Sequence, residues 1–246
     1  MSHYVELHCH TNFSLLDGAS HPEDLVSRAK ELGMQALAAT DHDGLYGAVR
    51  FWRATRDAGL HCILGVEFTC DGGYHLLLLA KGQTGYSNLC RLVSHAQLRR
   101  SKGRASLNPS LLAQHAADLF CLSGCRRGEI ATHLLAGRRQ EAVAAASKYA
   151  RIFGEGNFWI ELQDHLLPDD RWLADEMVAL ADSLGLGVVA TNDVHYALPD
   201  GRRRGIGLAT AFKNVGYSFG FPDRSTARVE IALGERGEIE RVDLAV

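Results

Sequence analysis

The sequence lacks a long hydrophobic run. Its uninterrupted apolar stretches, such as residues 76–80, are far shorter than the roughly 18 residues that a membrane-spanning helix needs. The first residues also lack a basic segment followed by an apolar one, so we expect no secretory signal. Six cysteines in 246 residues are too sparse for a small disulfide scaffold and predict reduced thiols. We therefore expect a cytoplasmic protein without a membrane partner.

An excess of charge of one sign is also missing. Lys and Arg number 26 against 29 Asp and Glu, and a net charge of -3 disfavours a nonspecific nucleic-acid binder. The chain has no glycine-rich dinucleotide or phosphate-binding motif and no G-x-S-x-G, which argues against dinucleotide enzymes, P-loop proteins and serine hydrolases. With 46% hydrophobic residues the composition is ordinary for a folded globular protein.

Strand-like and helix-like segments alternate along the chain. Apolar or β-branched runs predict seven strands, at about 5–10, 36–41, 61–68, 74–81, 118–123, 157–163 and 187–193. Helical patterns lie at about 22–32, 44–57, 85–99, 139–153 and 169–184. Such alternation favours an α/β protein built on a parallel sheet or a barrel.

Twelve histidines are present, and several stand beside acidic residues. His8 and His10 lie two residues apart on a predicted strand, where alternate side chains share a face, so both imidazoles can meet one metal ion. This pair alone is equally compatible with hydrogen-bonded surface histidines. Seven other histidines receive an ordinary structural interpretation, although His75 begins a strand beside the proposed site. Spacing alone gives His95 that interpretation too.

Further metal-binding residue types follow other predicted strands, at the edge where α/β barrels gather functional groups. They are Asp17, His42, Glu67, Cys125, Asp193 and His195. Together with the histidine pair they exceed what one ion can use, so the residues predict a multinuclear site. Nitrogen, oxygen and one sulfur donor suit zinc, with manganese or iron as alternatives. Closely spaced metal ions of this kind activate water for phosphoester hydrolysis.

The motifs resemble those of the PHP (polymerase and histidinol phosphatase) superfamily. The resemblance rests on the runs HCH at 8–10, TDH at 40–42, GVE at 65–67, LSGC at 122–125 and NDVH at 192–195. GYSNL at 85–89, ELQDH at 161–165 and TND at 191–193 are closest to the N-terminal PHP domain of bacterial DNA polymerase III alpha subunits, especially the error-prone type. The match extends over about residues 4–200.

This resemblance implies a distorted (β/α)7 barrel over residues 1–200, followed by a tail of uncertain structure over 201–246. It implies a trinuclear site of divalent ions, with Glu67, Asp193 and His195 as catalytic residues and a metal-bridging hydroxide as nucleophile. The resemblance, and not the spacing, makes His95 and Cys125 candidate ligands. The nine implied ligands are His8, His10, Asp17, His42, Glu67, His95, Cys125, Asp193 and His195.

The function expected from these features is that of a metal-dependent phosphoesterase. Its substrate would be a small phosphate ester or the 3′ end of single-stranded DNA, and DNA polymerase components are candidate partners. The alternative is a non-catalytic, metal-stabilised scaffold that binds a partner. An amidohydrolase is disfavoured by Cys125 and by the lack of a clear lysine for carbamylation. Because a polymerase subunit would continue into palm, thumb and fingers, we expect no DNA synthesis from this chain alone.

Overall fold

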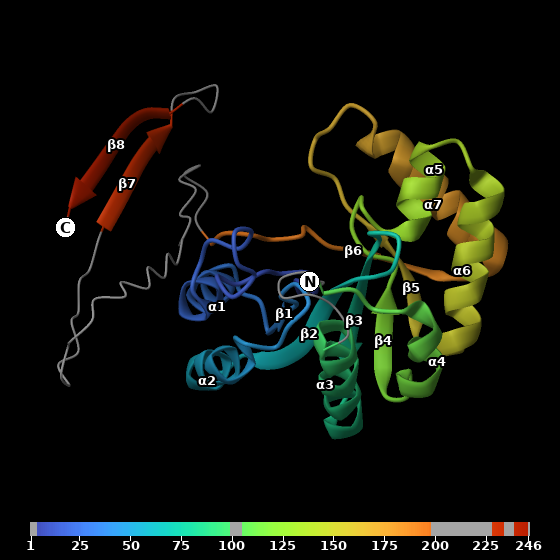
Figure 1. Ribbon diagram of the computed structural model, residues 1–246, viewed down its shortest axis with the longest axis horizontal. Coiled ribbons are helices and arrows are strands. Elements are labelled where there is room, and N and C mark those ends of the chain that lie inside the picture. Colours follow the sequence, from blue (N-terminus) through green and yellow to red (C-terminus); the bar gives the residue numbers. More distant parts are fainter. Residues whose placement is uncertain (1–3, 99–104, 198–227, 234–238, 246) are drawn as a thin grey trace, which may run out of the picture. The chain divides into compact units, whose positions relative to one another are not determined.

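The computed structural model describes residues 4–98, 105–197, 228–233 and 239–245 (Figure 1). The chain divides into two compact units, Met1–Gly207 and Leu208–Val246. In the second unit β7 (Arg228–Leu233) pairs antiparallel with β8 (Ile239–Ala245). The rest of the tail predicted over 201–246 lies outside the described residues, and the boundary at residue 200 stays a prediction.

A curled sheet of six strands forms the centre of the described part of the first unit. In spatial order these are β1 (Ala36–Ala39), β2 (His61–Thr69), β3 (His75–Ala80), β4 (Leu119–Leu122), β5 (Phe158–Leu162) and β6 (Gly187–Ala190). Their spatial order is also their chain order. The α/β class and the distorted-barrel prediction are therefore confirmed.

Strand β3 is the main distortion of the barrel. It runs antiparallel to both β2 and β4, whereas the other pairs are parallel. Thr69 and His75 are joined by a short turn in which Gly72 and Gly73 have φ of 93° and 81°. A turn of this length reverses the chain and is too short for the helical crossover that parallel strands require. The expectation of a parallel sheet is wrong at this strand.

The first predicted strand, at 5–10, lies between β1 and the residues after β6 but forms only isolated bridges. Glu6 bridges to Leu37, and Cys9 bridges to Val194. The Glu6 carboxylate is buried and accepts hydrogen bonds from the backbone N–H groups of His8, at 2.9 Å, and Asn192, at 3.1 Å. We call the contact between residues 6–10 and 192–195 the seam of the barrel. It is closed partly by the side chain of Glu6.

Helices cover the outside of the sheet (Figure 1). The five predicted helices are confirmed, and the short helices α4 and α5 were not predicted. Helix α1 begins at Pro22 with Glu23 and Asp24 in its first turn, where acidic groups favour the helix dipole. The described helices are α1 (Pro22–Glu31), α2 (Ala48–Ala58), α3 (Gln83–Leu98), α4 (Leu112–His115), α5 (Glu129–Leu135), α6 (Arg139–Phe153) and α7 (Asp170–Leu184), with a 3₁₀ turn at Pro109–Leu111.

The core lies on both faces of the strands. Phe68 and Leu78 are fully buried among residues of the helices around β2 to β5, and Leu77 and Leu79 point into a separate cluster with Leu122. Leucine at successive positions of β3 therefore fills both faces, which is why this strand reads as a continuous apolar run. Of the helices described, none has the length and apolar character that crossing a membrane demands.

Candidate metal centre

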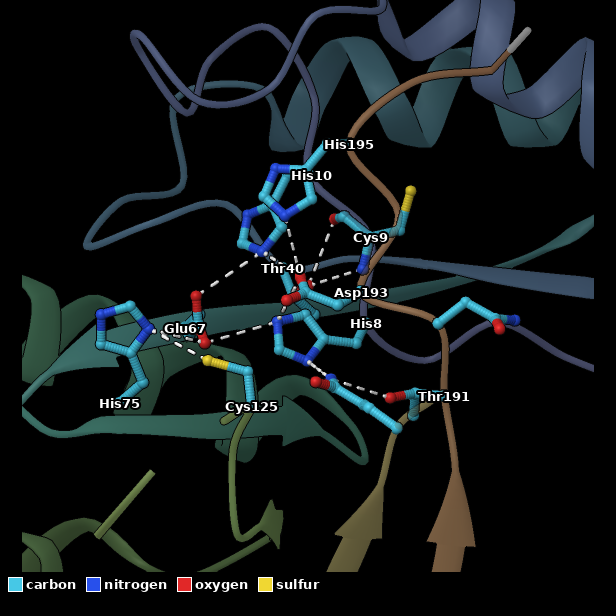
Figure 2. Close-up of polar contacts among 12 residues, drawn as sticks. His8, Cys9, His10, Thr40, Glu67, His75, Cys125, Thr191, Asp193 and His195 are labelled. Carbon is cyan, nitrogen blue, oxygen red and sulfur yellow. Dashed lines mark hydrogen bonds and ion pairs between the residues drawn. The ribbon is translucent and has the colours of Figure 1, made fainter. Parts of the chain in front are cut away.

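Most of the predicted ligands gather at the edge where the parallel strands end, and Figure 2 shows six of them, His8, His10, Glu67, Cys125, Asp193 and His195. His8 and His10 are both fully buried. Their Nε2 atoms lie 3.3 and 3.2 Å from one oxygen of Asp193, Oδ1. Within the described structure neither Nε2 atom has a hydrogen-bond partner of suitable geometry. The two buried Nε2 atoms thus lie close to one carboxylate oxygen, but no described protein group forms a hydrogen bond with either of them.

Glu67 is the centre of the cluster, and only 1% of it is exposed. Its Oε1 lies 3.5 Å from His8 Nε2 and 3.0 Å from His75 Nδ1, and its Oε2 lies 3.6 Å from His10 Nε2 and 3.0 Å from His42 Nε2. Burial would raise the pKa of this carboxyl, but the neighbouring imidazoles, above all His8 and His75, hold it well below its usual range. Glu67 is therefore a carboxylate that faces four imidazoles.

The more exposed side of the cluster is formed by Asp17, His42 and His195. Asp17 Oδ2 lies 3.1 Å from His42 Nε2 and 3.3 Å from His195 Nδ1. His195 Nε2 lies 3.1 Å from Asp193 Oδ1. The rings of His42 and His195 stack on His10, at 4.6 and 4.7 Å between centroids. Hydrogen bonds from both histidines hold the pKa of Asp17 below its usual range.

Cys125 lies on the other side of Glu67, beside His75 (Figure 2). Its Sγ is 3.4 Å from His75 Nδ1. Burial raises the pKa of this thiol above its usual range.

The structure places His95 on α3 next to His115, with 5.9 Å between the ring centroids. His75, which sequence reasoning interpreted as structural, is the histidine that contacts both Cys125 and Glu67.

A further set of residues contacts the Nδ1 atoms of His8 and His10, on the ring edges opposite Nε2. His8 Nδ1 donates to Glu161 Oε1 at 2.7 Å, and His10 Nδ1 lies 3.1 Å from Ser14 Oγ. Ser14 Oγ donates to the buried Asp41 at 2.8 Å and accepts from the backbone N–H of His42 at 3.0 Å, which leaves its second lone pair to accept from His10. Sequence reasoning gave Glu161 and Asp41 no such role.

The donors present fit divalent metal ions. Three groups of side chains each bring their ligand atoms within 4.8 Å of one another. Imidazole and carboxylate donors in such sets suit zinc and manganese, and the unsatisfied Nε2 atoms of His8 and His10 are oriented as ligands. The groups are His8, His10 and Asp193; His10, Asp17 and His42; and His42, Glu67 and His75.

The loop that carries Asp17 is closed by a contact that only glycine permits. A Cβ added at Gly18 would lie 1.9 Å from the backbone oxygen of Thr11. The variant Gly18→Ala is expected to displace this loop and to weaken metal binding by about 10- to 100-fold, as loss of a supporting contact does elsewhere. Metal titration of the purified variant measures this. Gly33→Ala is the control for backbone strain away from this loop, because φ at Gly33 is 75° and a Cβ there meets nothing within 4 Å. Equal metal affinity in both variants would contradict the prediction.

Known proteins resemble this chain over most of its length. Residues 6–165 match the PHP domain. The chain belongs to the PHP domain family. The PHP chain is 42% identical over 208 residues to DNA polymerase III subunit alpha of Treponema pallidum, and 44% identical over 209 residues to error-prone DNA polymerase of Symbiobacterium thermophilum. These alignments cover 79% and 78% of this chain but 18% and 19% of the relatives, so the chain spans about a fifth of their length.

A solved structure shares the fold. It is a two-domain protein containing a predicted PHP-like metal-dependent phosphoesterase from Bacteroides vulgatus, with a TM-score of 0.50 and 15% sequence identity. The superposition covers 78% of this chain and 51% of that chain. At this level of sequence identity the likeness shows only that the two proteins share a fold.

Proposed function

We propose that this PHP domain is a metal-dependent phosphoesterase whose cluster holds three divalent ions. The observation that carries the proposal is the convergence of His8 and His10 Nε2, buried and without a hydrogen-bond partner in the described structure, on Asp193 and Glu67. Protein groups alone leave these atoms unsatisfied, which is costly for buried polar groups. Coordination of a cation would satisfy them.

The residues divide into three ligand sets in this proposal, two of which share Glu67. His8, His10, Glu67 and Asp193 would form the first set; Glu67, His75 and Cys125 the second; and Asp17, His42 and His195 the third. Here His75 takes the position for which the family resemblance suggested His95. When bound, divalent ions at such sites supply Lewis acidity and lower the pKa of water to near neutrality.

The exposure of the cluster's side chains indicates where a substrate would enter. His8 and His10 are fully buried, whereas His42, His195 and Asp17 have side chains that are 25%, 29% and 38% exposed. A phosphate ester would therefore approach from this exposed side. His195, whose ring nitrogens lie 3.3 Å from Asp17 and 3.1 Å from Asp193, would serve as a ligand on this side.

The substrate class follows from this chemistry and from the relatives. A small phosphomonoester or diester fits the proposed reaction, and so does a DNA 3′ end, since the curated relatives are DNA polymerase subunits. We include DNA polymerase components as partners of the domain, and a cytoplasmic location, on the same basis.

Elemental analysis together with hydrolysis assays tests this function. The assays use a chromogenic phosphomonoester, a phosphodiester and 3′-labelled single-stranded DNA, with wild type and His10→Ala. We expect close to three ions per chain in wild type and no detectable turnover in His10→Ala. His61→Ala, at the exposed first residue of β2, serves as the control. Bound metal without turnover of any substrate would contradict the esterase and favour the non-catalytic scaffold.

A further inference from the structure

Glu161 is a buried carboxylate next to the cluster that no predicted ligand set includes. It lies on β5 and is 3% exposed. Its Oε1 accepts a hydrogen bond from His8 Nδ1 at 2.7 Å, on the ring edge that faces away from Glu67 and Asp193. A buried carboxylate is expensive unless it is well satisfied, so this one needs a reason to be there.

The contact determines which nitrogen of His8 is available to a metal. An ionised carboxylate only accepts hydrogen bonds, and Glu161 Oε1 lies 2.7 Å from His8 Nδ1. Gln163 Nε2 is farther from Nδ1, at 3.2 Å, and has Glu161 Oε1 and Thr191 Oγ1 as acceptors for its two hydrogens, so His8 Nδ1 carries the hydrogen. In the neutral ring the lone pair is then on Nε2, the atom 3.5 Å from Glu67 and 3.3 Å from Asp193. We propose that Glu161 is a positioning residue, which keeps the Nε2 lone pair of His8 directed at the metal site. This inference rests on the proposed function.

The carboxylate is itself held by residues that follow β6 and its own strand, β5. Thr191 Oγ1 donates to Glu161 Oε1 at 2.5 Å, and Gln163 Nε2 donates to the same oxygen at 3.1 Å. The backbone N–H of Glu161 donates to Ser123 Oγ, which follows β4, at 2.9 Å. Glu161 is thus fixed by residues after β4, β5 and β6, independently of His8.

The neutral variant Glu161→Gln tests the role with little change of shape. We expect affinity for Co²⁺ to fall by about 10- to 100-fold, the range seen when a carboxylate behind a metal-bound histidine is lost. We also expect the visible absorption spectrum of the Co²⁺-loaded protein to change, because the spectrum reports ligand geometry. A purely structural role would lower the melting temperature of the metal-free protein and leave both readouts unchanged.

Two controls separate this role from general damage. Glu129→Gln makes the same chemical change at a half-buried carboxylate that accepts from Lys148 and Tyr149, and it should leave Co²⁺ affinity unchanged. If Glu161→Gln does not fold, Thr191→Val and Thr191→Ser replace it. The valine variant removes the hydroxyl and should weaken binding, and the serine variant should restore it.

The outcomes distinguish this proposal from the function on which it rests. Wild-type protein that binds no Co²⁺ would overturn the metal centre itself. Wild-type binding with an affinity in Glu161→Gln within about twofold of wild type, and an unchanged spectrum, would overturn only the role of Glu161. Equal affinities in Thr191→Val and Thr191→Ser would have the same meaning where the first variant is unfolded.

Discussion

Phosphoester hydrolysis by Glu67→Gln is expected to be lower than that of wild type by about 10³-fold or more, since the loss removes a charged group on which the transition state depends. Glu67 is 1% exposed and faces the imidazoles of His8, His10, His42 and His75. An amide at this position carries no charge and offers one acceptor atom instead of two. Both the metal content and the turnover should therefore fall.

Steady-state hydrolysis of the preferred substrate, with metal content measured on the same samples, checks this result. A thermal melt shows whether the variant is folded. Glu129→Gln is the matched control, because it neutralises a half-buried carboxylate on α5. Turnover of a folded Glu67→Gln protein above a tenth of wild type would mean that Glu67 is not central to the reaction.

Affinity for metal ions is expected to fall at least about tenfold for each pH unit as the solution is acidified, because bound ligands must be deprotonated. Burial would lower the pKa of His195, but its hydrogen bonds with Asp17 and Asp193 outweigh burial and raise the pKa to about 10. In the metal-free protein this imidazole is therefore protonated at neutral pH, and an ion must displace its proton. Affinity should thus rise with pH up to about 10.

Calorimetric titration with Zn²⁺ in two buffers of different ionisation enthalpy counts the protons released. We expect at least one proton per chain at pH 7, and about one fewer in His195→Gln. His61→Ala is the control for a histidine outside the cluster. An unchanged proton count in His195→Gln would show that this residue binds no ion.

Much of the architecture was predictable from local patterns. Period-2 alternation placed His8 and His10 on one face, and the rule that parallel strands end at a common edge grouped Asp17, His42, Glu67, Asp193 and His195. The structure brings all of these side chains into one cluster. This grouping was predictable because it depends on strand direction and spacing, which the sequence expresses locally.

The role of His75 was not predicted because it depends on the direction of β3. On a parallel strand its position, at the beginning, would lie at the far end of the barrel from the cluster. Because β3 is reversed, its first residue reaches the edge where its neighbours end. The short, glycine-containing turn before His75 was the available signal. Glu161 was missed because its role depends on His8, 153 positions away, a pairing that no local pattern expresses.

The seam of the barrel gives the cluster a second consequence. His8 and His10 lie on one side of it, and Asp193 and His195 lie on the other, while few backbone hydrogen bonds join the two sides. The Glu6 carboxylate already ties segments that are 186 positions apart. An ion coordinated from both sides would act as a reversible cross-link between the two ends of the barrel chain, comparable to a disulfide that encloses a very long loop. Cation occupancy and closure of the barrel would then be a single equilibrium.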